Sequence, residues 1–465
     1  MVQTSYFGYI FIHFWELIAL PFYFIVIYLF ANYIKHRRIK NNPVYKFYVW
    51  GLFAKIIGGL VFVFVYLYVY KGGDTTAYFE SSMALHNLMN TDFGSYLVNQ
   101  FGSPNYERFS FFTSDTGYPL PYMYFDTQTY MVIRLINPLL IFSFSSYLLT
   151  TVLLDWIAYT GLWRLFLVFS EHYPKRTNLF ALAILFFPSI IFWGSGILKD
   201  TITLSCTGWV VYCINKIFIL RKQRIRFLII LGINIFIVLL IKPYVIFALF
   251  PGSLLWILSS RILNIRSVLI RVMIVPVVFG VSIWGGYYLL SYMGRYMGKF
   301  ALEKIEKTAI ITQYDLKQNY YHGHSFDIGI TDASLGGLIR KFPDAFVAGI
   351  YRPFLWESGN AVMLITGLEN GFILILTIIA LFRNPFSSLR KIISDPLLFF
   401  AITFSIFFAF SVGLTTSNFG ALVRFKIAYL PFFLCALFIL INYKEETSIQ
   451  TSEPIFRGKR VPLLR

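Results

Sequence analysis

The sequence has few charged residues. Asp, Glu, Lys and Arg make up 13% of the 465 residues, whereas a typical soluble domain carries about 25%. Hydrophobic residues reach 57% and aromatic residues 20%, and the mean hydropathy is +0.67. This composition excludes an ordinary water-soluble protein and indicates an integral membrane protein. The length suits one polytopic domain over residues 1–465.

Acidic residues are especially scarce, with 22 Asp and Glu against 40 Lys and Arg, which gives a formal charge of +18. The basic residues fall in short clusters between apolar runs. These clusters therefore indicate which loops are cytoplasmic, and no nucleic-acid partner is expected. Only three cysteines occur, all in apolar runs and without CxxC spacing. A disulfide framework and a zinc site are thus not indicated.

Several motifs are also missing. There is no Walker A motif, no HExxH and no GxSxG, so the sequence does not support ATP hydrolysis or the commonest intramembrane metalloprotease and hydrolase chemistries. The N-terminus lacks the charged region of a cleavable signal, and we interpret it as the first, retained span.

Apolar runs predict an all-α membrane protein with eleven transmembrane helices. A spanning helix needs about 20 mostly apolar residues, and fewer inside a bundle. The predicted spans are 9–33, 47–70, 146–169, 178–197, 201–220, 226–241, 244–260, 268–292, 362–382, 397–413 and 421–442.

Basic clusters orient these spans, because short cytoplasmic loops collect Lys and Arg. Clusters such as 35–40 and 221–226 fall on one side of the predicted membrane. The N-terminus is then extracytoplasmic and the C-terminus cytoplasmic, with a flexible polar tail over 444–465. Two large loops, 71–145 and 293–361, face the outside. Amphipathic stretches in the first loop, at 77–90, 92–100 and 128–143, predict helices lying along the interface.

The stretch KGGDTTAYFESSMAL holds the strongest candidate for chemistry. Gly72 and Gly73 permit a sharp turn as the second span ends, and Asp74 with Thr75 and Thr76 is typical of the start of a helix running to about residue 90. Two interpretations remain open. Asp74 caps this helix and does nothing more, or it is a catalytic carboxylate at the membrane surface.

The stretch PSIIFWGSGILKDT places Lys199 and Asp200 in the seam between two apolar runs. Adjacent residues on a helix point about 100° apart, so each can address a different partner. Lys199 could snorkel and Asp200 could cap the fifth span. Alternatively, Lys199 binds a phosphate while Asp200 orients it or contacts a sugar hydroxyl.

Three further cations, Lys242, Arg352 and Arg424, are predicted on the same outer side. Positive charge there runs against the usual bias toward the cytoplasm, so these residues indicate an anionic ligand such as phosphate. His322 and His324, with Asp327, form a weak HxH pattern for a metal.

Layout and motifs together resemble the C-type glycosyltransferase superfamily (GT-C). The resemblance covers about residues 47–250 and rests on GGDTTAY, FFPSIIFWGSGILKDT and LIKPYV. It implies an enzyme that moves a sugar from a polyprenyl phosphate or diphosphate donor to a glycan or lipid-linked acceptor on the extracytoplasmic face. Asp74 would be the general base, helped by a divalent cation, Mg²⁺ or Mn²⁺. An extra preceding span and a single acid in place of a pair depart from the superfamily pattern and leave metal dependence open.

The predicted site then consists of two groups. The catalytic residues are Asp74 and Asp200, and the phosphate-binding residues are Lys199, Lys242, Arg352 and Arg424. Candidate substrate contacts are Tyr78, Glu357, His322 and His324. The resemblance further implies a bacterial inner-membrane protein that assembles cell-envelope polysaccharide and contacts membrane lipids.

Other functions stay open. The chain also resembles Wzy-type polysaccharide polymerases, in which the outer cations would matter most and Asp74 would be secondary. A flippase or secondary transporter of lipid-linked glycans is the alternative of another class. It would use the intramembrane residues Lys55, Asp155 and Arg164, for which burial beside other helices is the simpler explanation. A membrane scaffold is a third reading.

Overall fold

The computed structural model describes residues 10–222, 224–263, 325–329, 335–383 and 385–441, with scattered positions between 273 and 288. Throughout these residues the regular structure is helical, apart from one isolated bridge between Ser325 and Asn418. The prediction of an all-α chain is therefore confirmed for the described part.

Seven described helices are long and apolar enough to cross a membrane, and eight if a bent pair counts as one span. The seven are α1 (Phe14–Ile39), α2 (Tyr48–Phe64, extended at both ends to give Pro43–Val69), α8 (Tyr147–His172), α11 (Lys199–Ile214, continued to Ile219), α12 (Arg224–Ile241), α18 (Ala361–Phe382) and α20 (Pro396–Thr415). The bent pair is α21 (Phe419–Lys426) and α22 (Leu430–Ile441), which meet at 64°. The chain is a multi-pass membrane protein.

The predicted count of eleven is not confirmed, and each missing span has its own reason. The segment 178–197 is interrupted, because α9 (Thr177–Ala181) and a π-helical turn at Leu182–Phe186 lead into α10 (Pro188–Trp193), after which residues 194–198 are not helical. In α13 (Pro243–Leu263) the apolar part, Pro243–Ser259, is shorter than a full span. The span predicted at 268–292 lies largely outside the described residues.

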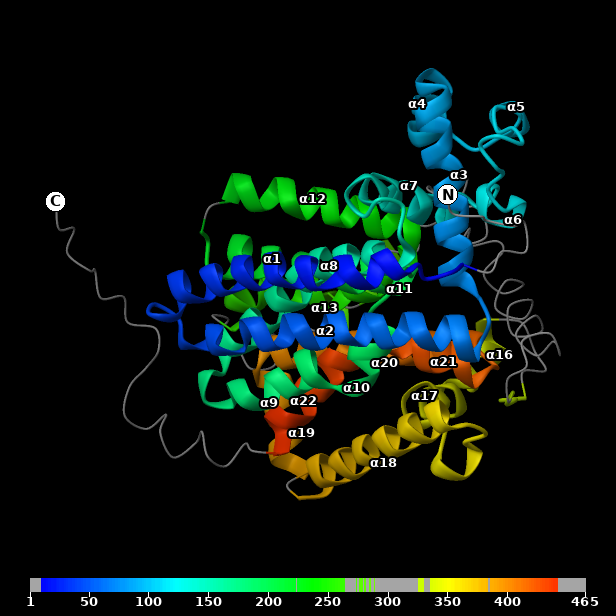
Figure 1. Cartoon of the computed structure of the whole chain (residues 1–465). Coiled ribbons are helices and arrows are strands. Elements are labelled where there is room, and N and C mark those ends of the chain that lie inside the picture. The colour runs from blue at the N-terminus through cyan, green and yellow to red at the C-terminus, as the bar shows by residue number, and fades with distance from the viewer. Residues whose placement is uncertain are drawn as a thin grey trace.

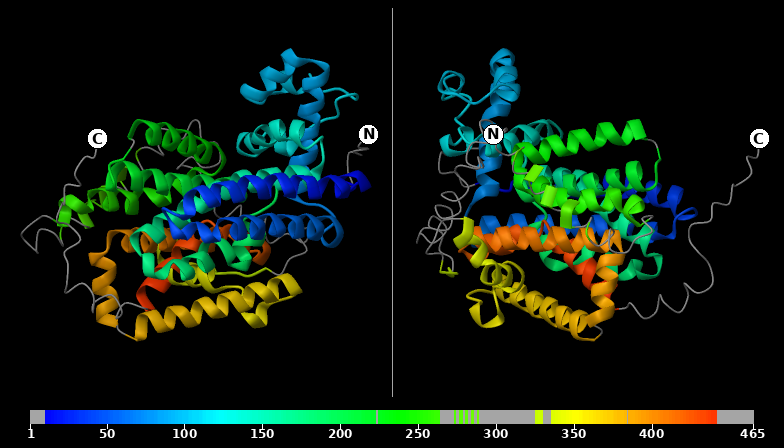
Figure 2. Two further views of the ribbon diagram at one scale, coloured as in Figure 1. Left: turned by 60° about the vertical axis from the view of Figure 1, so that its left-hand side comes forward. Right: turned by 180° about the vertical axis from the view of Figure 1, so that it is seen from behind.

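The long helices run side by side, and the predicted first loop lies at one end of them (Figure 1). This loop folds into α3 (Asp74–Thr91), α4 (Phe93–Phe101), α5 (Tyr106–Phe109), α6 (Pro121–Tyr124) and α7 (Thr127–Phe142). Helix α3 stands across the ends of the spans in every view (Figures 1 and 2). We call α3–α7 the lobe and this end of the bundle the lobe end.

Polar contacts fasten α3 in this position. The Thr75 and Tyr147 hydroxyls lie 2.8 Å apart and join α3 to α8. The Asn137 side chain of α7 donates to the Ser82 carbonyl of α3 at 3.2 Å. Because these groups are buried, their hydrogen bonds fix α3 relative to the spans.

The described part of the second predicted loop includes α16 (Leu335–Arg340) and α17 (Phe342–Tyr351). Helix α19 (Pro385–Ser394) connects α18 to α20 at the end of the bundle opposite the lobe (Figure 1). The tail predicted at 444–465 lies outside the described residues.

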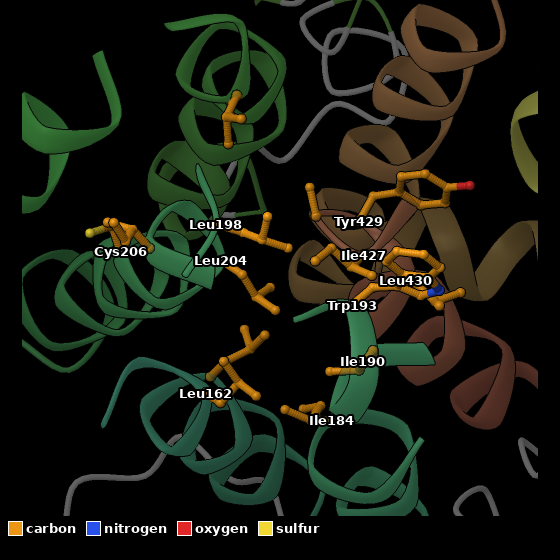
Figure 3. Packing of buried hydrophobic residues seen from close by; sticks show 14 of the residues in the cluster. Leu162, Ile184, Ile190, Trp193, Leu198, Leu204, Cys206, Ile427, Tyr429 and Leu430 are labelled. Carbon is orange, nitrogen blue, oxygen red and sulfur yellow. The ribbon is translucent and has the colours of Figure 1, made fainter. Parts of the chain in front are cut away.

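Small residues let the central helices approach closely. A side chain at Gly161 of α8 would collide with the backbone of Ser205 in α11, and one at Gly208 would collide with Gly161. Such contacts are the usual basis of helix packing in membranes, where water does not drive association. Apolar side chains of α8, α10, α11 and the α21–α22 bend face one another in the core of the bundle (Figure 3).

Candidate functional site

Four predicted site residues form one continuous ion-pair network at the lobe end. Asp200 binds Lys242 through one carboxylate oxygen and Arg424 Nε through the other, the latter at 2.7 Å. A second nitrogen of Arg424 lies 2.6 Å from the Asp74 carboxylate. The residues come from α3, α11, the α12–α13 junction and α21, which are distant in sequence. We call these four residues the outer network.

Asp74 is free to join this network because another residue caps its helix. Gly73 is the N-cap of α3, and the Thr76 hydroxyl lies 2.8 Å from the Gly73 carbonyl, which accepts its hydrogen, and 3.1 Å from the Gly73 N–H. Gly72 and Gly73 have φ values of 126° and 143°, as the predicted exit turn requires. The interpretation of Asp74 as only a helix cap is therefore wrong, and its carboxylate faces Arg424 instead.

Asp200 likewise does not cap its span. Helix α11 begins one residue earlier, its N-cap position is Leu198, and no side chain caps it. Asp200 is 2% exposed and accepts from two cations, whereas Asp74 is 48% exposed at its side chain. A buried carboxylate needs such partners to offset its lost hydration. Asp200 thus holds Lys242 and Arg424 in place, while Asp74 is the carboxylate that solvent and ligands can reach.

Lys199 points to the lobe. Its ammonium group donates to the Thr129 hydroxyl at 2.6 Å and lies 3.7 Å from the Asp126 carboxylate of the α7 N-cap. The Thr129 hydroxyl also donates to Asp126 at 2.6 Å. As predicted for adjacent helical residues, Lys199 and Asp200 address different partners.

Arg352 and Glu357 form an ion pair of their own, with Arg352 Nε 2.9 Å from a Glu357 oxygen. The Arg352 guanidinium stacks 4.6 Å from the Phe326 ring centre. The Arg352 carbonyl accepts from buried Lys426 of α21, the helix that also carries Arg424. This pair therefore borders the outer network through α21.

Tyr78 is a buried member of the site, with 2% exposure. Burial, followed by the charge of Asp74, raises its pKa well above the ordinary value. The phenol therefore stays protonated and can act only as a neutral hydrogen-bonding group. His322 and His324 lie outside the described residues, so their assignment remains a prediction.

Every cation predicted to bind phosphate has a carboxylate neighbour: Lys242 and Arg424 have Asp200, Lys199 has Asp126, and Arg352 has Glu357. An incoming phosphate must therefore share or displace a carboxylate. The exposed member, Asp74, is the one that can yield Arg424 at least cost.

Sequence reasoning missed two acids of the lobe. Asp126 lies in GYPLPYMYFDTQTY, where only the aromatics drew attention. Glu80 follows Asp74 on α3 and is half-buried, and burial raises its pKa to about 7. Its charge, like that of Asp74, acts on the exposed Tyr122. The sequence signal that could have identified Glu80 was the presence of a second acid on the helix that begins at Asp74.

Among the described residues, no three His, Cys, Asp or Glu side chains group closely enough to hold a metal ion. In the outer network both carboxylates already hold cations, so this donor set does not suit a divalent cation.

Comparison with protein-family models, with curated proteins and with solved structures found no match. The described part of the chain defines a class: a helical, multi-pass membrane protein with a network of ion pairs, one acid buried and one exposed, at one end of its bundle.

Proposed function

We propose that this protein is a membrane glycosyltransferase that moves a sugar from a polyprenyl phosphate or diphosphate donor to a glycan or lipid-linked acceptor. The observation that carries the proposal is the outer network, in which one accessible carboxylate shares a guanidinium with a buried carboxylate. A base and phosphate-stabilising cations are the two things that such a transfer needs at one place.

In the proposed step, the acceptor hydroxyl oxygen attacks the anomeric carbon of the donor sugar. The bond between that carbon and the phosphate oxygen breaks, and its electron pair leaves with the phosphate. Asp74 takes the hydroxyl proton. Charge on Asp74 is thereby lost as charge develops on the phosphate, so Arg424 can turn from one anion to the other. Asp200 stays ionised and keeps Arg424 and Lys242 at the site.

The position of the network supports a lipid-linked donor. It lies where α3 crosses the ends of spanning helices, and exposed apolar side chains cover the neighbouring spans α1 and α2. A polyprenyl tail in the bilayer would hold its phosphate at this depth. We further propose a bacterial inner membrane, with the lobe end extracytoplasmic, the N-terminus on that side and the C-terminus in the cytoplasm.

Within glycosyl transfer, single-sugar transfer and Wzy-type polymerisation share this chemistry. The test compares lipid-linked and surface glycans, by mass spectrometry, between the native host and a deletion strain. Loss of one defined sugar supports single-sugar transfer, and collapse of a polymer ladder to one repeat unit supports polymerisation. Unchanged glycans contradict both.

Transport of a lipid-linked glycan is the second candidate, favoured by the two interrupted helices, α10–α11 and α21–α22. Broken helices at membrane depth mark binding sites in many transporters. Against it, the polar residues expected to form its route do not line up. Asp155 pairs with Lys55, while Arg164 lies nine residues farther along α8, about 13 Å, and stacks on Trp209. Flux in liposomes without a covalent product would favour transport.

A further inference from the structure

The chain is not helical at residues 194–198, inside the bundle and just before α11. Asp155, which contacts this segment, lies eight residues into α8, about 12 Å from the start of that helix. Backbone groups that lose their helical partners away from water must find others.

Two charged side chains form hydrogen bonds with this non-helical segment. Lys55 of α2 donates to the Gly194 carbonyl and to the Ser195 hydroxyl, the latter at 3.3 Å. Asp155 accepts from the Gly196 N–H at 3.2 Å. Each charge therefore binds one side of the break. We call Lys55, Asp155 and residues 194–196 the latch.

The two charges also pair with each other, with Lys55 Nζ 3.6 Å from Asp155 Oδ1 and exposures of 2% and 0%. A buried ion pair often gives no more stability than well-packed apolar residues would. We expect this pair to act through its geometry, because its two side chains reach the backbone atoms of residues 194 and 196 and so fix the conformation of the break.

One face of α2 leaves room for the non-helical segment and its neighbours. Lys55, Gly58, Gly59 and Phe62 follow the i, i+3, i+4, i+7 spacing. A side chain at Gly58 would collide with the Ile191 carbonyl of α10, and one at Gly59 with the Asp155 carboxylate. Phe62 packs against Gly196, whose φ of 79° is in the left-handed region that favours glycine.

The latch ends where the site begins. Residues 197 and 198 are fully buried, and Lys199 and Asp200 are the first two residues of α11. A shift of the break by one residue would rotate Asp200 about 100° away from Lys242 and Arg424.

We infer that Lys55 and Asp155 are positioning residues: their latch sets the start of α11 and so places Asp200 between the two cations of the outer network. The geometric part of this inference is independent of the reaction, and its catalytic consequence rests on the proposed function.

Thiol labelling tests the geometric part. Cysteine is placed at Ile197, next to the latch, or at Leu204 on α11 as the matched control, because these side chains are 0% and 1% exposed. Cys206, Cys213 and Cys435 are replaced by alanine. The ratio of maleimide labelling rates, I197C over L204C, is compared in membranes with and without Asp155→Leu, which removes the acceptor for the Gly196 N–H. We expect the ratio to rise about tenfold through local opening of the break.

An unchanged ratio would overturn the inference, whether both sites stay protected or both become reactive through general unfolding. The exchanged pair, Lys55→Asp with Asp155→Lys, checks the chemistry of the latch. It should leave the ratio as high as in Asp155→Leu, because an aspartate at 55 cannot donate to the Gly194 carbonyl and a lysine at 155 cannot accept from the Gly196 N–H. A return to the parent ratio would show that opposite charges alone hold the break and would contradict the latch.

Kinetics test the catalytic consequence. In folded Lys55→Met protein, we expect the KM for a polyprenyl phosphate-linked donor to rise about fivefold or more, because the phosphate site is displaced. A purely structural role would lower the amount of folded protein and leave this KM unchanged. If wild-type protein shows no transfer, the proposed function fails, while the labelling ratio still decides the latch.

Discussion

The outer network and the Lys55–Asp155 pair use the same groups at two places in the bundle, and they differ in access. Asp155 and Lys55 are 0% and 2% exposed, and they bind each other and the backbone of one break. The outer network also has a buried acid, Asp200, but it continues through Arg424 to a carboxylate that is 48% exposed. The fully buried Lys55–Asp155 pair therefore shapes the backbone, and chemistry is expected only where a network of charges reaches the surface.

The largest effect should come from the buried acid of the outer network. Asp200→Asn removes the carboxylate that pairs with Lys242 and leaves Arg424 with only the half-exposed Asp74, which we expect to cost about 3–5 kcal/mol of stability. Asp74→Asn removes a half-exposed ion pair and should cost less than about 1 kcal/mol. Thermal unfolding in detergent measures both. Equal losses for the two variants would break the distinction between a buried and an accessible acid.

The inner pair should behave like Asp200 when one partner is removed. Asp155→Asn leaves Lys55 uncompensated, with an expected loss of about 3–5 kcal/mol. Replacing both charges, as in Lys55→Met with Asp155→Leu, should recover part of that loss, because no buried charge remains. The same unfolding experiment applies, and a double variant less stable than the single one would contradict this account.

Arg424 should be sensitive to a change that keeps its charge. The guanidinium contacts Asp200 and Asp74 with different nitrogens, whereas a lysine offers one compact ammonium group. Arg424→Lys should lose a charged hydrogen bond, about 1.5–3 kcal/mol, or roughly 10- to 100-fold in transfer rate. Lys216→Arg, at the opposite end of α11, is the control. Full activity in Arg424→Lys would show that bridging is not required.

The smallest effect concerns Glu80. Its pKa is raised to about 7 by burial, so the folded protein holds a proton that the unfolded chain releases near its ordinary pKa. Stability from this group is present below about pH 4.5 and is lost as pH rises through about 7. Thermal midpoints of wild type should therefore fall between pH 5 and pH 8 more than those of Glu80→Gln. Parallel pH profiles would contradict the raised pKa.

The sequence predicted which residues of the candidate site lie near one another better than it predicted their contacts. Apolar runs and basic clusters placed Asp74, Lys199, Asp200, Lys242 and Arg424 at one membrane level, and the described structure brings them to one end of the bundle. Hydropathy can do this because span length and side are one-dimensional properties.

Which residues these side chains contact could not be predicted in the same way. Asp74 and Thr76 are both good residues for the start of a helix, but the N-cap is Gly73, and the Asp74 carboxylate instead pairs with Arg424, which is 350 residues away in the sequence. The break at 194–198 is hidden in an apolar run, because its partners Lys55 and Asp155 come from other helices. These outcomes depend on tertiary packing, which local pattern does not contain.

The most direct measurement is complementation of the deletion strain with Asp74→Asn, followed by mass spectrometry of lipid-linked and surface glycans. Asp115→Asn, which alters another exposed acid of the lobe, is the matched control. Our account predicts that Asp74→Asn, present in the membrane at normal levels, cuts the product about 10²- to 10⁴-fold, as expected for loss of a general base, while Asp115→Asn restores it. Full restoration of the glycan by Asp74→Asn would contradict the central claim.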